Sequence, residues 1–448
     1  NTPIYTVPRV LTSVSWPLGR LELITRQSTL DEIRVLGYDD SLQKTIHLGR
    51  TDDRRVITDI YETSQGQQRD ICSFEYYDGP TDAGTYTDRW GFLNGEPFSQ
   101  TNPNNPRHTY MGQQVDGFSR EPNFYATRKR SLQKIVYPTG GWTEFEYELH
   151  QGRFPMNTPE NMYLLGGTWS GELYTVGGLR IKSITQYKDA NDPGSKIQYA
   201  YQHPTDVAKG GQIFSGYLDT RVRKKSGKVT TYGVALKPDY QFLDYTGSPV
   251  LYNYVREILP NGSYNEYEFT GLSDYMDLKG EMALGTDFSL NIYMPDHHHM
   301  VPFSSQYFRR GLLKQVTQYD ASGQNVHTET YTYHTGPEKD AVNAYLLFAV
   351  NPESDAAEYY KGRYKWSSCP VVLASKTTSG LYEPSITTTY SYLSDYADLL
   401  PRSIEETSGE TSIKTILKYP QDYYPLGIGV TPDTLATESE AEAHAIAW

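Results

Sequence analysis

A recurring pattern of two short strands around a tight turn constrains this chain more than any other feature. The stretch LQKIVYPTGGWTEFEYE, residues 132–148, alternates apolar and polar residues on both sides of a Pro-Thr-Gly-Gly turn. Alternation with a period of two, interrupted by Gly and Pro, is typical of a β-hairpin with one buried face. The stretch therefore predicts a hairpin in which Gly140 or Gly141 takes a positive φ.

The same pattern recurs along most of the chain. Each copy has an alternating strand, a turn rich in Gly, Asn, Asp or Pro, and a second strand that ends near a Tyr; the copies are residues 54–79, 132–148, 179–202, 255–270, 312–334, 372–393 and 401–419. Because a single hairpin is marginally stable in water, we expect the hairpins to lie edge to edge and to share a buried face. The sequence predicts an all-β fold of stacked antiparallel hairpins, either a curved sheet or a propeller-like assembly.

Long insertions separate the hairpins, at 80–125 and 271–310, so we do not expect a regular solenoid. Helix is expected only at 338–350 and 431–448, the second starting near Pro432. We expect a β-rich N-terminal domain over 1–130, an irregular hairpin array over 131–430, and a helix that begins at 431. Because the chain stops inside that helix, we expect the natural protein to continue beyond Trp448.

Composition excludes several functional classes. The net charge is −13, from 41 basic and 54 acidic residues, whereas nucleic-acid binding is favoured by clustered Lys and Arg. The one dense basic stretch, 126–134, is predicted to be a solvated loop. No run approaches the roughly 18 apolar residues that a membrane-spanning helix needs. The 40 Tyr residues suit half-exposed sheets, because the ring can be buried while the hydroxyl reaches water.

The chain has two cysteines, Cys72 and Cys369. They are far apart in sequence, and we expect them to stay single and buried, with a disulfide as the alternative. They do not indicate a cellular compartment.

Several motifs link the chain to a known family. Tyr319-Asp320 is followed by Gly323 and by Tyr331-Thr332-Tyr333, and residues 88–95, 120–126 and 302–313 read DRWGFLNG, REPNFYA and PFSSQYFRRGLL. In these motifs and their order, the chain resembles large bacterial cell-surface or secreted proteins with YD repeats, related to the Rhs proteins, over most of residues 40–420. It departs from their pattern because most hairpins lack the Tyr-Asp pair and their spacing is uneven.

The resemblance implies a non-catalytic scaffold or binding module of a larger exported protein, at the bacterial outer surface or outside the cell. Its expected partners are other parts of its own longer chain, including a C-terminal effector that it displays or encloses, or a surface protein complex. No cofactor is expected. No nucleophile–base pair and no phosphate-binding loop is visible in the sequence, so we predict no enzymatic activity for the chain.

One histidine cluster is a candidate metal site. Asp296, His297 and His299 lie in PDHHHM, and alternate residues of a strand share a face, so the two histidines can approach one cation. The cluster lies between Pro295 and Pro302, where a loop is expected, and metal sites need buried, oriented ligands. We therefore predict that no metal is bound tightly.

Three aromatic residues are candidate ligand-binding groups. Trp90 in DRWGFLNG, and Tyr76 and Tyr77 before Asp78-Gly79, can act as stacking platforms for a sugar if they are exposed. The alternative is that they pack beneath turns, and we favour it. A carbohydrate-binding or carbohydrate-active surface protein is thus the second functional hypothesis, and the exposure of these rings distinguishes it from the scaffold.

Overall fold

The computed structural model describes most of the chain. The described residues are 11–53, 56–78, 87–88, 90–95, 108–110, 113–115, 121–153, 172–213, 221–226, 229–234, 248–275, 278, 281–284, 304–336, 339–350, 358–393 and 399–419. The protein is almost entirely β, with 60% strand and 3% helix, and its main feature is one antiparallel sheet of 18 strands. The expectation of an all-β fold built from antiparallel hairpins is confirmed.

The order of the strands in the sheet is their order in the chain. From one edge to the other they are β1 (Ser13–Trp16), β2 (Gly19–Arg26), β3 (Thr29–Gly37), β4 (Leu42–Arg50), β5 (Ile57–Ser64), β6 (Gln67–Tyr76), β9 (Leu132–Val136), β10 (Trp142–Gly152), β11 (Tyr174–Tyr187), β12 (Ser195–Ala200), β17 (Tyr254–Ile258), β18 (Tyr264–Phe269), β20 (Leu313–Tyr319), β21 (Asn325–Thr335), β24 (Val371–Gly380), β25 (Ile386–Ser391), β26 (Ser403–Ser408) and β27 (Thr411–Ile416). Within the described residues β1 pairs only with β2, and β27 only with β26, so the sheet is open.

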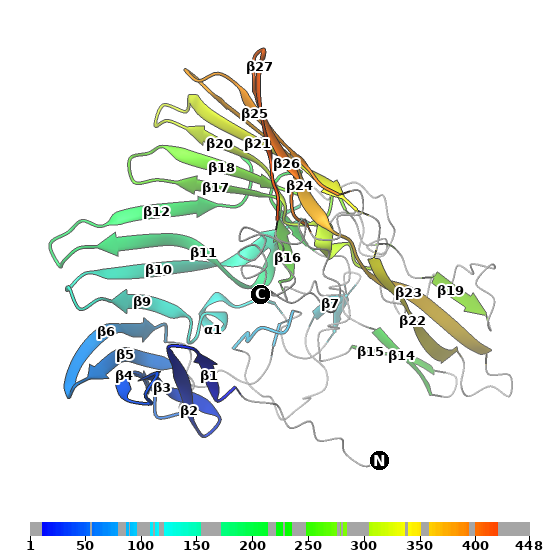
Figure 1. Ribbon diagram of the computed structural model, residues 1–448. Coiled ribbons are helices and arrows are strands. Elements are labelled where there is room, and N and C mark those ends of the chain that lie inside the picture. The colour runs from blue at the N-terminus through cyan, green and yellow to red at the C-terminus, as the bar shows by residue number, and fades with distance from the viewer. Residues whose placement is uncertain are drawn as a thin grey trace, which may run out of the picture.

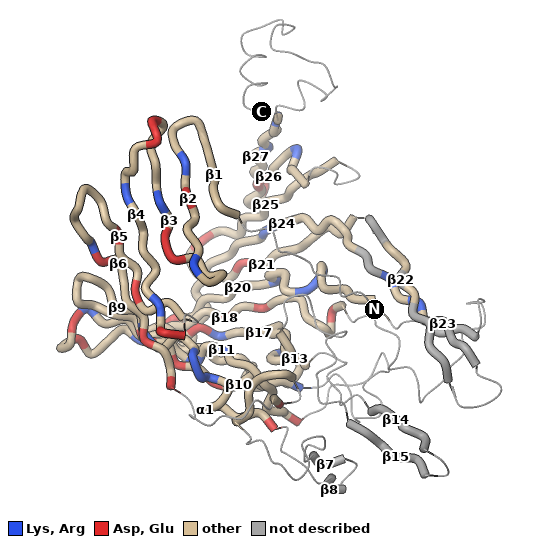
Figure 2. Tube along the Cα trace, turned by 90° about the horizontal axis from the view of Figure 1, so that it is seen from below, with Lys and Arg blue, Asp and Glu red and all other residues tan. Residues whose placement is uncertain are grey.

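The sheet is curved as well as open. Figure 2 shows β1–β6 standing at a steep angle to β17, β18, β20 and β21. Strand twist accumulates across many neighbours, so a sheet of this width bends rather than staying flat. Of the two arrangements that the sequence left open, the curved sheet is the one observed.

The long connections all leave the sheet on one side. In a meander, successive connections alternate between the two ends of the strands. One end, which we call the turn rim, carries only short turns. The other, the insertion rim, carries all five connections longer than 18 residues, namely 77–131, 153–173, 201–253, 270–312 and 336–370. In Figure 1 the short turns that join β5 to β6, β9 to β10, β11 to β12, β17 to β18 and β20 to β21 point to the left, and β19, β22 and β23 lie on the right.

The insertions contain their own small sheets. β7 (His108–Tyr110) pairs with β8 (Gln113–Val115), β13 (Gly211–Ile213) with β16 (Val250–Tyr252), and β14 (Arg221–Ser226) with β15 (Val229–Val234); β23 (Glu358–Ser368) lies between β19 (Glu281–Leu284) and β22 (Lys339–Val350). Helix is limited to α1 (Phe124–Thr127) and a 3-10 turn at Tyr307–Arg309 within the described residues.

All seven predicted hairpins are present, and three share one turn geometry. In residues 137–141, 259–263 and 320–324 the first residue's N–H donates to the fifth residue's carbonyl, and the fourth residue's N–H donates to the first residue's carbonyl. The fourth residue is Gly140, Gly262 or Gly323, with φ between +83° and +89°. This is the left-handed conformation that favours glycine. The positive φ predicted for the first hairpin therefore belongs to Gly140.

The tyrosine that ends a hairpin has a physical role. In five hairpins its hydroxyl donates to a backbone carbonyl in or next to the first strand, 18–20 residues earlier; the pairs are Tyr76–Ile57 (2.6 Å), Tyr201–Ile181 (2.6 Å), Tyr333–Leu313 (2.9 Å), Tyr392–Leu373 (2.8 Å) and Tyr419–Pro401 (2.9 Å). The bond ties the two strands together at the insertion rim, opposite the turn. The Tyr at the end of these five hairpins is therefore explained by hairpin closure.

The register gives the sheet two chemically different faces. Residues that are directly paired lie on the same face. One face is mostly apolar and half-buried, with residues such as Ile135, Phe145, Ile184, Val255 and Val316. We call the opposite one the polar face. From β2 to β18 it carries ion pairs, including Arg20–Glu22, Lys134–Glu75, Lys196–Glu146, Arg180–Glu148 and Arg256–Glu266.

The best-buried apolar cluster lies at the insertion rim rather than under the sheet. Trp90, Val176, Ile213, Val250 and Leu272 come from four different connections or strand ends, and none is more than 8% exposed. Gly177 is required beside it, because a Cβ at this position would lie 2.1 Å from the Asp88 carboxylate. The cluster thus joins separate insertions to the sheet.

Two local expectations from the sequence are corrected or completed. Residues 338–350 were expected to be helical, but β22 occupies Lys339–Val350 and pairs with β23 over most of its length. The partner strand decides this conformation, since a short apolar run suits either structure. Cys72 and Cys369 are both unpaired, as expected, although only Cys369 is fully buried.

The predicted domain boundaries stay predictions. The sheet itself continues across residue 130, because β6 pairs with β9. The predicted helix at 431–448 lies outside the described residues.

Candidate functional site

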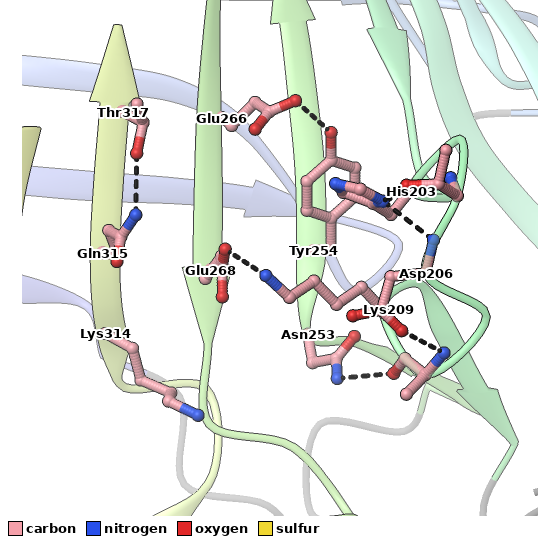
Figure 3. A network of polar contacts seen from close by, with 12 residues as sticks. His203, Asp206, Lys209, Asn253, Tyr254, Glu266, Glu268, Lys314, Gln315 and Thr317 are labelled. Carbon is pink, nitrogen blue, oxygen red and sulfur yellow. Dashed lines mark hydrogen bonds and ion pairs between the residues drawn. The ribbon is translucent and has the colours of Figure 1, made fainter. Parts of the chain in front are cut away.

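A network of polar contacts lies where the connection after β12 crosses the polar face of β17 and β18 (Figure 3). Asn253 fixes this connection, because its Oδ1 accepts from the Gly210 N–H at 2.7 Å and its Nδ2 donates to the Ala208 carbonyl at 3.1 Å. Lys209 reaches across the sheet, with its Nζ 2.5 Å from Oε1 of Glu268. These contacts hold residues 208–210 against the two strands.

A histidine folds the same connection from within. Nδ1 of His203 accepts from the backbone N–H of Asp206 at 3.0 Å, so this nitrogen carries no proton. The ring lies edge-on to Tyr254, with 5.0 Å between the ring centroids. Tyr254 is fully buried beneath it. The histidine is therefore a structural element of the loop.

Beneath the loop, Tyr254, Arg256 and Glu266 form a triad in which Tyr254 and Glu266 are buried and Arg256 is half-buried. The Tyr254 hydroxyl donates to Oε1 of Glu266 at 2.7 Å, and Nε and Nη2 of Arg256 donate to the same oxygen at 2.9 and 2.5 Å. The guanidinium also lies over the ring of Tyr264, 4.6 Å from its centroid. A carboxylate bound by this many donors is held in the ionised form.

Burial and hydrogen bonding shift the pKa values of Tyr254 and Glu266 away from neutral pH. Desolvation, and then the bond to Glu266, raise the pKa of Tyr254. Burial acts to raise the pKa of Glu266, but the bonds from Tyr254 and Arg256 outweigh it and the pKa is lowered. Neither group is therefore poised to exchange a proton near pH 7, which a general acid or base requires.

A second network lies next to the first, around Arg180. Its guanidinium donates to Glu148 Oε1 at 2.7 Å and to the Tyr252 hydroxyl at 2.9 Å, and lies 4.5 Å from the centroid of the Tyr201 ring. Tyr252 also contacts Nδ1 of His150 at 2.9 Å. Desolvation, with Arg180 nearby, lowers the pKa of His150 to about 4, so this histidine is neutral at physiological pH.

Together the two networks anchor the connection at 201–253 to the sheet. Their members come from β10, β11, β16, β17, β18 and the connection after β12, and their hydrogen-bonding groups bind one another. The sequence pointed to none of them. The available signal was the opposite charge of Arg256 and Glu266, which the turn at 259–263 places directly opposite each other.

The candidate ligand-binding residues contribute to packing. Trp90 is 8% exposed and belongs to the apolar cluster, which agrees with the packed alternative. The Tyr76 hydroxyl closes its hairpin on Ile57. The Tyr77 hydroxyl donates to the Phe145 carbonyl at 2.8 Å, and its ring packs under Arg128. These three rings do not form one exposed platform.

The candidate metal ligands Asp296, His297 and His299 lie outside the described residues. Among the residues that are described, no group of three or more His, Cys, Asp or Glu side chains is placed to hold a metal ion. In the same part of the chain, no helix has the length and apolar character needed to cross a membrane.

Comparisons with known proteins give limited information. No protein-family model and no curated protein matches the chain. Among solved structures, a chain of the Photorhabdus luminescens Tc holotoxin pore with the mutation TccC3-D651A is a weak structural neighbour, at 12% identity and a TM-score of 0.18. The alignment covers 90% of this chain but only 16% of that one. A likeness of this degree carries no argument about fold or function.

Proposed function

We propose that the chain is a non-catalytic β scaffold of a larger exported bacterial protein of the YD-repeat type. In this role the broad sheet holds the insertion-rim segments in fixed positions, and these segments contact the remainder of the longer chain, a C-terminal effector or a surface complex. The observation that carries the proposal is the placement of all five long connections on one rim.

The chemistry of the networks supports a structural role. The ion pairs and tyrosine bonds of the candidate site join loop to strand and strand to strand, and their pKa shifts lead away from neutral pH. A sheet with short turns on one rim and long segments on the other is expected to contact its partners through the long segments, because binding residues are concentrated on long loops held by a rigid framework.

Cross-linking mass spectrometry tests the contact side. The longer natural protein, purified intact, is treated with a short amine-reactive cross-linker. We expect cross-links from this region to other parts of the protein or to partners to involve insertion-rim lysines such as Lys209 and Lys365. Lys188, on the turn rim, is the matched reference. Predominant cross-linking through Lys188 would contradict the proposal.

A substrate screen tests the absence of catalysis. The purified chain is assayed against glycans, esters and peptides, and we expect no turnover. Reproducible turnover that is lost on Asp88→Asn or Asp296→Asn would overturn the non-catalytic assignment, since both carboxylates lie in long connections, where a catalytic group is most easily missed in the sequence.

A further inference from the structure

The sheet formed by β19, β22 and β23, which we call the projecting sheet, has two faces of opposite character. Directly paired residues lie on the same face, and every second residue of a strand shares it. Within the described pairings, charged residues occur on one of the faces only at its two ends, at Glu358 and Lys339. Between these ends the register places only apolar or aromatic residues and one glycine on it: Val342, Ala344, Leu346, Phe348 and Val350 of β22, Tyr360, Gly362, Tyr364 and Trp366 of β23, and Met282 and Leu284 of β19. We call it the apolar face.

The opposite face carries a line of cations along the central strand. Lys361, Arg363 and Lys365 are alternate residues of β23, so they repeat about every 6.8 Å on one face. Among the described residues that are directly paired with them, only Glu281, beside Arg363, is acidic. We call this the basic face. Its sign is opposite to that of the whole chain, whose net charge is −13.

The projecting sheet stands apart from the main sheet. Figure 1 shows β22 and β23 extending from the insertion rim away from the strands of the main sheet. The Lys365 N–H donates to Oγ of the buried Ser304 at 2.8 Å, which holds the base of β23 to the rest of the protein. Val342, on the apolar face, is 62% exposed, so this face is open to solvent at that position.

This composition suits the surface of a lipid bilayer. Contiguous exposed apolar residues mark interaction sites, and Tyr and Trp are enriched where a membrane meets water. Amphipathic elements that lie in a membrane surface bury their apolar face by about 5–10 Å and carry Lys and Arg on the other. Because packed sheets are about 10 Å apart, a sheet buried to this depth has its basic face near the level of the lipid phosphates.

Charge complementarity selects the occupant of the projecting sheet. A protein bound to the apolar face would leave the basic face without a role, whereas an anionic membrane engages both faces. Each Lys or Arg close to an anionic membrane strengthens binding several-fold. The insertion rim has a second basic element, because residues 221–228, in the connection at 201–253, read RVRKKSGK and carry five cations.

We propose that the projecting sheet lies in the surface of an anionic phospholipid membrane. In this arrangement the apolar face is in the lipid, and Lys361, Arg363 and Lys365 are at the level of the headgroups. Membrane binding goes beyond the proposed scaffold role and does not depend on it.

Matched threonine variants of the whole chain test the apolar face. The apolar-face variant is Val342→Thr with Leu346→Thr. Its control is Leu347→Thr with Ala349→Thr, on the opposite face of the same strand. Threonine keeps the preference for a strand and adds a polar hydroxyl. Circular dichroism and the melting temperature establish that both variants are folded. Should the apolar-face variant unfold, Val342→Thr alone, at an exposed position, provides the comparison.

A second pair of variants tests the basic face. The basic-face variant replaces Lys361, Arg363 and Lys365 by Gln. Its control replaces three exposed cations of the main sheet and its turns, and is Arg69→Gln, Lys188→Gln and Lys414→Gln. The two variants have the same net charge, so a difference between them reports the position of the charges.

Binding is measured by flotation with phosphatidylcholine vesicles, prepared with and without phosphatidylserine. We expect the native chain and both controls to bind the vesicles that contain phosphatidylserine, and less tightly at high salt. The apolar-face variant should bind both kinds of vesicle about tenfold more weakly, or worse, because it loses buried apolar surface. The basic-face variant should lose about tenfold or more on the phosphatidylserine vesicles alone.

Three results would overturn the proposal: no flotation of the native chain with either vesicle, equal binding by the apolar-face variant and its control, or equal binding by the basic-face variant and its control. Sedimentation velocity without lipid examines a second copy of the chain as the occupant. A dimer that the apolar-face variant abolishes, in a chain that does not bind vesicles, would assign the apolar face to self-association instead.

Discussion

At the scale of single residues, the fold depends on a few positions with strict requirements. Gly140 has φ of +89°, and no atom lies within 4 Å of where its Cβ would be, so only backbone conformation requires glycine there. His150 is the opposite case. It has no positive φ, and the buried surroundings of its side chain determine which residue is tolerated there. Its ring is buried beside the Arg180 guanidinium, where a second positive charge is unfavourable.

Replacing Gly140 by Val should lower the free energy of unfolding by about 1–3 kcal/mol, because valine resists a positive φ. Thr139→Val in the same turn is the control, since Thr139 has no positive φ, and it should have little effect. Urea denaturation measures both. Equal stability of the two variants would contradict the turn geometry.

His150 should make the protein less stable in acid. Its folded pKa of about 4 is below the ordinary value of 6.5, so the unfolded chain takes up the proton more readily. The contribution is fully present above pH 6.5 and is lost as the pH falls towards 4, by at most about 3 kcal/mol. Unfolding free energies at pH 4.5 and 7 should differ less in His150→Gln than in the native chain. An unchanged difference would show that other groups govern acid stability.

At the scale of elements, the unit of the structure is a hairpin fastened at both ends. One end is closed by a turn in which a glycine or a short polar residue satisfies the backbone. The other is closed by a tyrosine hydroxyl on a carbonyl of the partner strand. Aromatic pairs add to this between neighbouring hairpins; Tyr264 and Tyr319 stack at 4.6 Å, and Trp142 and Tyr187 at 4.8 Å.

Tyr333→Phe removes the closing hydroxyl and keeps the ring, so it should cost about 1 kcal/mol of unfolding free energy. The matched control is Tyr382→Phe, because Tyr382 is 94% exposed and should tolerate the change. Chemical denaturation of the two variants gives the comparison. If they are equally stable, the Tyr333–Leu313 bond does not contribute to hairpin closure.

At the scale of the whole molecule, the sheet and its insertions have separate roles. The sheet is a single continuous meander, and the best-buried apolar cluster lies at the insertion rim. Stability should therefore depend on the residues that reach this cluster, and much less on the parts of each connection that do not.

Two changes separate these contributions. Replacing residues 154–171 by a four-residue Gly-Ser linker should preserve the fold, because Gly152 and Tyr174 are already paired, and the shorter loop adds about 1 kcal/mol to stability. Ile213→Ala, at a fully buried position of the cluster, should cost about 2–5 kcal/mol. Thermal melting monitored by circular dichroism measures both. Loss of cooperative melting in the shortened chain would show that residues 154–171 are needed for folding.

The sequence by itself determined the hairpins and their turns. Period-two alternation and turn residues are local signals, and they located all seven predicted hairpins. For the turn at 137–141 they left Gly140 and Gly141 as alternatives, and the structure assigns the positive φ to Gly140. They also favoured packing for Trp90, but they could not identify its neighbours, because Val176, Ile213, Val250 and Leu272 lie far away in the chain.

Only the tertiary structure decided the rest. Strand–strand register between distant segments places all long connections on one rim, brings Arg180 and Tyr252 together, and gives the sheet of β19, β22 and β23 one apolar and one basic face. It also makes residues 339–350 a strand, because β23 lies beside them. The physical reason is that register is a property of two strands at once. The sequence of a single strand determines which of its residues share a face. Which residues of the neighbouring strand lie beside them on that face depends on the register between the two strands.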